Sequence, residues 1–231
     1  NHPLAHRCRR VGAVHSINSG GTALATINLG GTQIVSAGGT DLGAKISGGE
    51  QDIYGLASGD TIFAGSQVVE ASGTASGTVI SGGEQDVFGT ADGTLISGGS
   101  QVVEASATAS GTTILSGGLE IVSAGGTDLG ARISGGEQDD HGLASGATIF
   151  AGSQVVESGG LASATIVSGG EQDVFGTADG TLISGGREVV EALATASGTT
   201  IFTGALEVIS AGGTDLGARI SGGEQDDHGL A

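Results

Sequence analysis

Paired carboxylates are the residues of this sequence best suited to chemistry. Glu84 and Asp86 stand two residues apart, so in a strand they would share one face, near the separation that a glycosidase uses. The same pair recurs as Glu50/Asp52, Glu137/Asp139, Glu171/Asp173 and Glu224/Asp226. A catalytic pair is normally unique in a chain, so this repetition indicates a surface feature. We therefore predict no catalytic residues and no enzymatic activity.

Two copies of the same segment carry an Asp-His pair where other copies read Val-Phe or Ile-Tyr. Residues 138–141 and 225–228 both read Gln-Asp-Asp-His, and the departures are Asp140, His141, Asp227 and His228. The two aspartates fall in a column that should face the core, where an unpaired carboxylate is costly. We expect a local bulge to turn each aspartate outward. The alternative is an Asp-His pair or a weak cation site.

No other motif indicates a metal or a cofactor, and we predict neither. The spacing of His2, His6, Cys8 and His15 matches no zinc pattern. The Gly-Gly-Glu-Gln-Asp run is similar to the calcium-binding nonapeptide, but glutamine stands where that motif needs its second glycine. Residues 1–15 do not match the repeat, so we expect a loosely attached leader, or alternatively a cap on the first coil.

These residues are positioned by a short repeat. Its Ser-Gly-Gly-Glu-Gln core starts at Ser47, Ser81, Ser134, Ser168 and Ser221, at intervals of 34 and 53 residues that sum to a super-repeat of 87. Weaker copies between them give a mean unit of 17 to 18 residues, too short for a pair of helices. We predict one all-β parallel β-helix, a solenoid of about 11–12 coils over residues 16–231.

Three apolar columns should line the core of this solenoid, because β-branched residues stack well between paired strands. The first column comprises Ile27, Ile46, Ile62 or Phe63, Ile80, Ile96, Ile114, Ile133, Ile149, Ile166, Ile183, Ile201 and Ile220. The second comprises Ile53, Val69, Val87, Val103, Val122, Val156, Val174, Val190 and Ile209. The third comprises Ala57, Ala91, Ala109, Leu129, Ala144, Ala178, Ala196 and Leu216.

Two polar columns run beside them. The first comprises Gln33, Gln51, Gln67, Gln85, Gln101, Gln138, Gln154, Gln172 and Gln225, with Glu120, Glu188 and Glu207 in the same place. The second comprises Thr61, Thr78, Thr94, Thr113, Thr148, Thr165, Thr181 and Thr200. We interpret both as structural ladders bonded along the axis. A row of ligand-binding amides and an ice-binding threonine face are the alternatives.

Charge and composition exclude several classes of partner. The formal net charge of −18, with 25 acidic and 7 basic residues, repels phosphate backbones and anionic lipid, so we predict no nucleic-acid partner. Cys8 is the single cysteine, so no intrachain disulfide can form. The sequence contains neither a run of 18 apolar residues nor a signal peptide, which fits an exported chain whose signal has been removed or an internal fragment.

The repeat resembles that of AIDA-type self-associating autotransporter adhesins. Residues 159–174, Gly-Gly-Leu-Ala-Ser-Ala-Thr-Ile-Val-Ser-Gly-Gly-Glu-Gln-Asp-Val, carry the resemblance across both corners, and it extends over about residues 16–231. It implies a right-handed β-helix, the passenger domain of a protein exported to the outer membrane surface of a bacterium. Such passengers mediate self-association, biofilm formation and host adhesion.

The resemblance also implies partners and a modification. Expected partners are identical rods and surface glycans or proteins of host or bacterium. Passengers of this kind are often decorated with heptose by a heptosyltransferase. By position, the acceptors here would be Ser47, Ser81, Ser97, Ser116, Ser134, Ser168, Ser184 and Ser221. A polysaccharide-acting β-helix enzyme and a passive structural stalk are the alternative functions.

Overall fold

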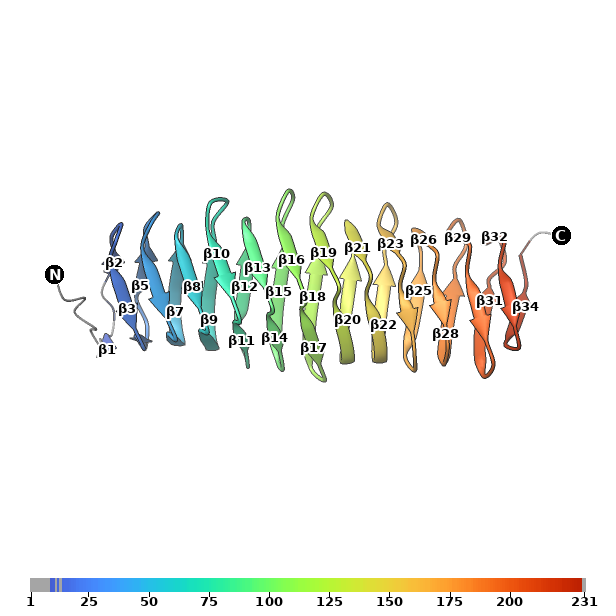
Figure 1. Ribbon diagram of the computed structural model, residues 1–231, viewed down its shortest axis with the longest axis horizontal. Helices are drawn as coiled ribbons and strands as arrows, with labels where there is room; N and C mark the ends of the chain where they lie inside the picture. The colour runs from blue at the N-terminus through green and yellow to red at the C-terminus, as the bar shows by residue number, and fades with distance from the viewer. Residues whose placement is uncertain (1–8, 11, 13, 230–231) are drawn as a thin grey trace.

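The chain forms a straight rod in which each coil stacks on the one before it. The computed structural model describes residues 9–10, 12 and 14–229, and all regular elements in this part are strands. The coils follow one another in sequence order from one end to the other, so the two termini lie at opposite ends (Figure 1). No helix capable of crossing a membrane occurs within this part of the chain.

Each coil contains up to three strands, which we name after the inward-facing residue that is most common among them. The isoleucine strands are β1 (Arg9–Arg10), β4 (Ile27–Asn28), β11 (Val79–Ile80), β14 (Leu95–Ile96), β17 (Thr113–Leu115), β24 (Ile166–Val167), β27 (Leu182–Ile183), β30 (Thr200–Phe202) and β33 (Arg219–Ser221). The glutamine strands are β2 (Val14–Ile17), β5 (Thr32–Val35), β12 (Glu84–Val87), β15 (Gly99–Val103), β18 (Gly118–Val122), β25 (Glu171–Val174), β28 (Gly186–Val190), β31 (Ala205–Ile209) and β34 (Glu224–Asp227).

In four coils one long strand runs through the glycine corner and includes both of these segments. These long strands are β7 (Lys45–Ile53), β9 (Thr61–Val69), β20 (Arg132–Asp140) and β22 (Thr148–Val156). The alanine strands are β3 (Thr22–Leu24), β6 (Thr40–Leu42), β8 (Leu56–Ser58), β10 (Thr74–Ser76), β13 (Thr90–Asp92), β16 (Thr108–Ser110), β19 (Thr127–Leu129), β21 (Leu143–Ser145), β23 (Leu161–Ser163), β26 (Thr177–Asp179), β29 (Thr195–Ser197) and β32 (Thr214–Leu216). Paired strands therefore extend to Arg9, into the segment for which we predicted a leader or cap.

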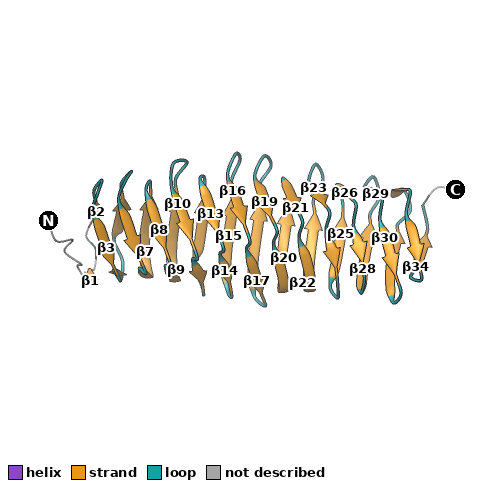
Figure 2. Cartoon of the chain, in the orientation of Figure 1, coloured by secondary structure: helices purple, strands orange, loops and turns teal. Residues whose placement is uncertain are grey.

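All ladders between coils are parallel and bring equivalent residues together. The alanine strands form a sheet of 12 strands, one for each coil, and the other strands form a sheet of 22 (Figure 2). Ile62, for example, pairs with Ile46 on one side and Ile80 on the other. The predicted all-β parallel solenoid of about 12 coils is therefore confirmed, because each repeat supplies one rung.

The core consists of stacked isoleucine, valine and alanine files. All members of the predicted second column are buried, from Ile53 to Ile209, and that prediction is confirmed. The first column is wrong at Ile27 and Ile166, because Asn28 and Val167 occupy the buried position in their coils. In both coils, as in most others, the buried residue stands two places before the corner glycine. Ile220, in the last described coil, pairs in register with Ile201 but is 55% exposed.

The third column is wrong at its two leucines. Leu129 and Leu216 are 44% and 58% exposed. Asp128 pairs with Ala109 and Asp215 with Ala196, so these aspartates occupy the alanine file instead. Asp41 occupies the same position beside Ala57 and is fully buried. Carboxylates thus enter the core at 87-residue intervals, in a place that sequence reasoning assigned to leucine.

The glutamine column is a buried ladder of side-chain amides, which confirms its structural role. Gln67 Nε2 donates to Gln51 Oε1 over 2.6 Å, and Gln85 Nε2 donates to Gln67 Oε1 over the same distance. The ladder continues with Gln101 on Gln85, and with Gln154 and Gln172 beyond Gln138. These amides therefore bond to one another from coil to coil, which gives the buried polar groups their hydrogen-bond partners.

The threonine column was predicted in part at the wrong residues. The buried threonines are Thr26, Thr78, Thr94, Thr112, Thr165, Thr181 and Thr199, whereas Thr61, Thr113, Thr148 and Thr200 are partly exposed. The hydroxyls bond to the glutamine ladder and not to each other: Thr78 Oγ1 donates to Gln67 Oε1 and accepts from Gln85 Nε2. The threonine and glutamine columns thus form one hydrogen-bonded network.

Glycine at the corner between isoleucine and glutamine strands is required by a close backbone approach. Gly152 has a φ of 85°, and a Cβ there would lie 2.1 Å from the carbonyl oxygen of Gly136 in the preceding coil. Gly65 has the same φ, and a Cβ would lie 2.2 Å from the oxygen of Gly49. Both the φ and the lack of space exclude side chains, and a furrow follows the corner from coil to coil.

Candidate functional site: an exposed serine file beside an acidic face

The serines predicted as acceptors line one corner of the rod. In most of these coils the serine directly follows the buried residue of the isoleucine strand, so the alternation of a strand turns its hydroxyl outward. All eight are exposed: Ser47, Ser81, Ser97, Ser116, Ser134, Ser168, Ser184 and Ser221. Such hydroxyls are accessible to an enzyme that transfers a group to them.

Aromatic side chains take the place of serine in some coils of this file. Phe63, Phe150 and Phe202 follow their buried isoleucines and are 49%, 42% and 40% exposed. Ser97 Oγ and Ser184 Oγ instead donate to the carbonyl oxygens of Ile80 and Val167, over 3.3 and 3.5 Å. The file therefore combines exposed hydroxyls with flat apolar surfaces at three places, a combination suited to contact with sugars or with another protein.

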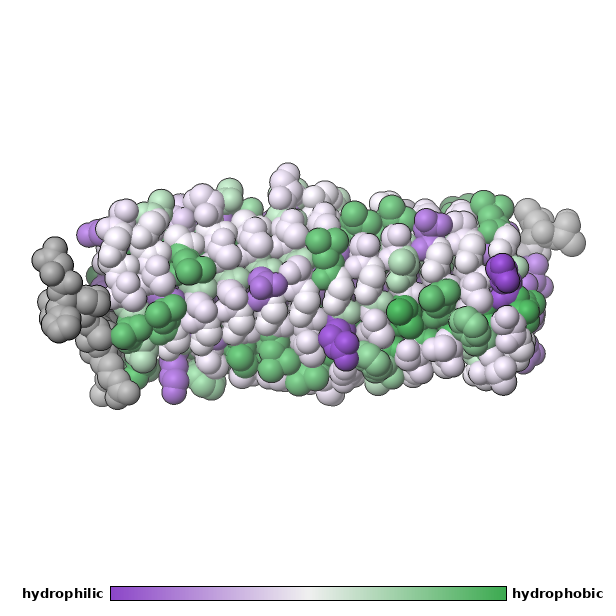
Figure 3. Space-filling model, viewed as in Figure 1, coloured by the Kyte–Doolittle hydropathy of each residue, from purple (hydrophilic) through white to green (hydrophobic). Residues whose placement is uncertain are grey.

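The furrow beside this file contains several shallow grooves. One, of about 370 Å³, is lined by Gly118, Gly136 and Gly152 with Glu137 and Ser153 at its edge. A second, of about 480 Å³, follows the same corner past Gly170 and Gly186 to Arg187. In Figure 3 apolar residues are likewise spread along the length of the rod and are not collected in one place. These surfaces suit a long, repeated contact.

The paired carboxylates lie on the outer side of the glutamine strands. Glu84 is exposed and Asp86 half-buried, and the other pairs repeat this arrangement with small variations. Partial burial, together with the neighbouring Glu50 and Glu70, raises the pKa of Asp52 to about 6. The same causes raise the pKa values of Asp139 and Asp173 to about 6, with Glu137 and Glu171 as the nearest carboxylates. This face holds protons more tightly than isolated carboxylates would.

The predicted outward bulge at Asp140 is wrong. Asp140 pairs in register with Val122 and Val156, is fully buried, and its Oδ1 accepts from the Gly142 N–H over 3.0 Å. Burial raises its pKa to about 7, so the carboxyl remains in the core by retaining a proton over much of the pH range. His141 is exposed on the outer side of the chain.

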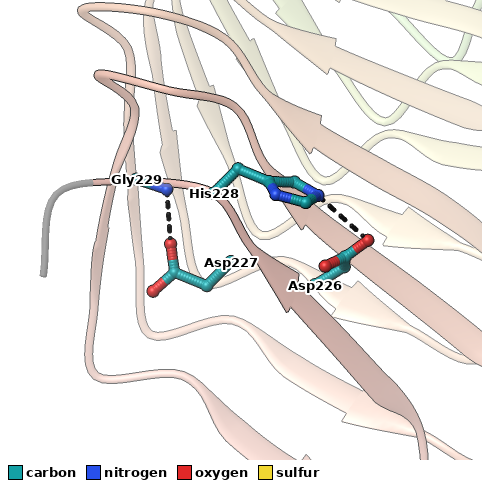
Figure 4. A network of polar contacts seen from close by, with 4 residues as sticks. All are labelled: Asp226, Asp227, His228 and Gly229. Carbon is teal, nitrogen blue, oxygen red and sulfur yellow. Dashed lines mark hydrogen bonds and ion pairs between the residues drawn. The ribbon is translucent and has the colours of Figure 1, made fainter.

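The second copy lies in the last described coil and is exposed, since within residues 14–229 it is packed against a neighbouring coil on one side only. There Asp227 Oδ1 accepts from the Gly229 N–H over 2.8 Å, and His228 Nε2 lies 3.2 Å from Asp226 Oδ2 (Figure 4). The histidine therefore pairs with Asp226 and points away from Asp227. Within residues 9–10, 12 and 14–229, no group of three or more histidine, cysteine or acidic residues is placed to hold a metal ion.

Of the four leader residues considered for a metal, the structure places one. His15 lies in β2 and is partly buried, while His2, His6 and Cys8 lie outside the described residues.

A further buried carboxylate, Asp128, escaped the sequence reasoning, and it shares an amide with Glu120 of the predicted glutamine column. Gln138 Nε2 donates to Glu120 Oε2 over 2.8 Å and to Asp128 Oδ2 over 3.0 Å, so one amide serves two acids. Burial raises the pKa of Glu120 well above its usual value and that of Asp128 to about 6. The only signal was the position of Asp128 two residues before a corner glycine, where other coils have alanine.

Comparison with known proteins supports the architecture. No protein-family model and no curated protein sequence matches the chain. Among solved structures, it is similar to the TibC-catalysed, hyper-glycosylated fragment 55–350 of TibA, with a TM-score of 0.82 and 30% sequence identity. The similarity covers 93% of this chain and 92% of that fragment. The chain therefore belongs to the AIDA-type, adhesin-like β-helix family that includes this TibA fragment.

Proposed function

We propose that this protein is an extracellular passenger of the autotransporter type that acts at the bacterial surface by adhesion and without enzymatic activity. The observation that carries the proposal is the uniform rod, along which the exposed serines, the glycine furrow and the paired carboxylates recur. A repeated surface forms many weak contacts at once, and their effects multiply when several are engaged. Identical rods are the first partner, which would promote aggregation and biofilm, and host or bacterial surface glycans and proteins are further ones.

The test is surface display. Bacteria that display this chain should sediment as aggregates within hours and adhere to one another, whereas bacteria that display an unrelated solenoid of similar length should stay dispersed. Soluble chain added in excess should slow aggregation by occupying the same surfaces. Aggregation equal to that of the control would contradict the proposal.

We propose in addition that the corner serines carry sugar, transferred by a heptosyltransferase. Support comes from their common exposure and from the family member crystallised in hyper-glycosylated form. The intact mass of chain produced together with such an enzyme should exceed the sequence mass by multiples of one heptose. Replacement of the eight serines by alanine should remove most of this increment, while replacement of the alanine-strand serines Ser58, Ser76, Ser110 and Ser145 should not. An unchanged mass for the chain with its serines intact would contradict the modification.

A further inference from the structure

Exposed charge is distributed unequally around the rod. Most exposed or half-buried carboxylates lie on the outer side of the glutamine strands and on the residue that follows them. We call this surface the acidic face: Glu50, Asp52, Glu70, Glu84, Asp86, Glu104, Glu137, Asp139, Glu157, Glu171, Asp173, Glu191, Glu224 and Asp226. Outside it, Asp92 and Asp179 lie on the alanine strands, where they accept hydrogen bonds from Ser110 and Ser197.

The outer side of the isoleucine strands, which we call the cationic face, carries charge of the opposite sign. Between Ile27 and Ser221 this cationic face carries no carboxylate, and it holds the exposed cations Lys45, Arg132 and Arg219. The Arg132 guanidinium lies 4.8 Å from the ring centroid of Phe150 in the next coil, which holds its charge at the surface. The two faces therefore differ in sign in the coils of these three cations; on the acidic face, Arg187 pairs with Glu171.

Both faces have the same period. Lys45, Arg132 and Arg219 are spaced by 87 residues, and so are Asp52, Asp139 and Asp226 on the acidic face. Each cation shares a coil with one of these aspartates, because β7 and β20 contain both residues and β33 is followed directly by β34. A second rod lying parallel and in register would consequently place each cation opposite its matching acidic group at the same time.

Building on the proposed self-association, we propose that the cationic face of one rod docks on the acidic face of a second, parallel copy of this chain. One exposed ion pair contributes little to the binding free energy, but several pairs repeated along a rigid rod form together, and their contributions add. The contact joins two different faces, so each added rod leaves one of each free, and association continues beyond the dimer. Two acidic faces, in contrast, repel each other.

Charge reversal tests the docking. Variant one carries Lys45→Glu, Arg132→Glu and Arg219→Glu, and variant two carries Asp52→Lys, Asp139→Lys and Asp226→Lys. Each variant alone should associate about 10- to 100-fold more weakly than the wild-type chain in sedimentation velocity, since three contacts become repulsive. A mixture of the two should associate again, because the reversed faces match each other and the unchanged faces still match. A control with Asp92→Lys and Asp179→Lys, on the alanine strands, should associate like the wild type.

The outcomes separate this inference from the function on which it rests. A wild-type chain that stays monomeric would contradict self-association itself. A wild-type chain that associates while variant one associates equally well would overturn the docking proposal alone. The docking proposal would also be overturned if the mixture of the two variants did not associate, provided that circular dichroism shows both variants to be folded.

Cross-linking tests the register without changing charge on the cationic face. In a Cys8→Ser background, a Ser134→Cys chain mixed with a Glu137→Cys chain should form mixed disulfide dimers, because the two positions share a coil on opposite partners. Ser97→Cys lies two coils away, so parallel docking in register places it about 10 Å further along the axis from Glu137→Cys of the partner. It should therefore cross-link to Glu137→Cys at least about fivefold less under the same conditions. Equal yields would contradict parallel, in-register docking.

Discussion

At the residue scale, Asp140 shows how an acid is tolerated inside a valine file. Its neighbours in the file are Val122 and Val156, and one carboxylate oxygen has a backbone donor in Gly142 while the other has no hydrogen-bond partner. Keeping the proton avoids the cost of a buried charge, so the pKa rises and folding favours the neutral acid.

We expect Asp140→Val to stabilise the rod by about 2–4 kcal/mol at pH 8, and by much less at pH 4. At pH 8 the wild-type protein must either bury the charge or bind a proton against the solvent, whereas at pH 4 the folded acid is neutral and the unfolded acid is already about half protonated. Thermal melts at the two pH values measure the difference. Asp227→Val, at the exposed equivalent position, is the matched control and should change little; equal effects of both variants would contradict this account.

At the element scale, the interior ladder is interrupted where glutamate replaces glutamine. Glu120 accepts from Gln138, and its second carboxylate oxygen has no hydrogen-bond partner. Gln33 occupies the equivalent place one super-repeat earlier, so the coil geometry accommodates an amide there.

Glu120→Gln should therefore raise the thermal midpoint at pH 8 and leave it nearly unchanged at pH 4. The amide carries no charge to bury, and its N–H groups can donate to Asp128 or to the neighbouring ladder. Gln101→Glu, one coil away, is the reciprocal variant and should lower the midpoint at pH 8 by a similar amount. A lower midpoint for Glu120→Gln at pH 8 would count against the ladder interpretation.

The glycine corner supports a second prediction at this scale. Gly152→Ala should lower the free energy of unfolding by about 1–3 kcal/mol more than Gly146→Ala does. Both glycines have a positive φ, but a Cβ at Gly152 meets the Gly136 oxygen, whereas a Cβ at Gly146 has nothing within 4 Å. Urea titrations of the two variants compare them directly, and equal losses would mean that the φ alone matters.

The sequence predicted these elements well where polarity and periodicity agree. The valine file and the glutamine ladder recur at each rung, and the short repeat length excluded helices. Errors arose where hydrophobicity and position conflict: Leu129 is more apolar than Asp128, yet Asp128 stands at the buried place in the strand. Counting back from the corner glycine would have identified Asn28, Asp128 and Val167, because the turn, and not hydrophobicity, sets which side chain points inward.

At the scale of the whole molecule, the buried acids make folding sensitive to pH. Burial raises the pKa values of Asp60 and Glu207 to about 7 and that of Glu188 to about 8. Because these folded-state values lie above the usual carboxyl range, their contribution to stability is full below about pH 4 and is lost as pH rises through 7–8.

We therefore expect the melting temperature of the rod to be higher at pH 5 than at pH 8. Circular dichroism at matched ionic strength measures it, and the variant combining Asp140→Val with Glu120→Gln should show a smaller difference. A melting temperature that rises from pH 5 to pH 8 would contradict neutral acids in the core.

The repetition of unlike faces along one rod is the basis for the adhesion that we propose. The measurement that tests this most directly is sedimentation velocity of the wild-type chain over a wide concentration range at about 0.15 M salt. The account predicts that the weight-average sedimentation coefficient increases steadily with concentration, without a plateau at the dimer. A single monomeric boundary at all concentrations would contradict it.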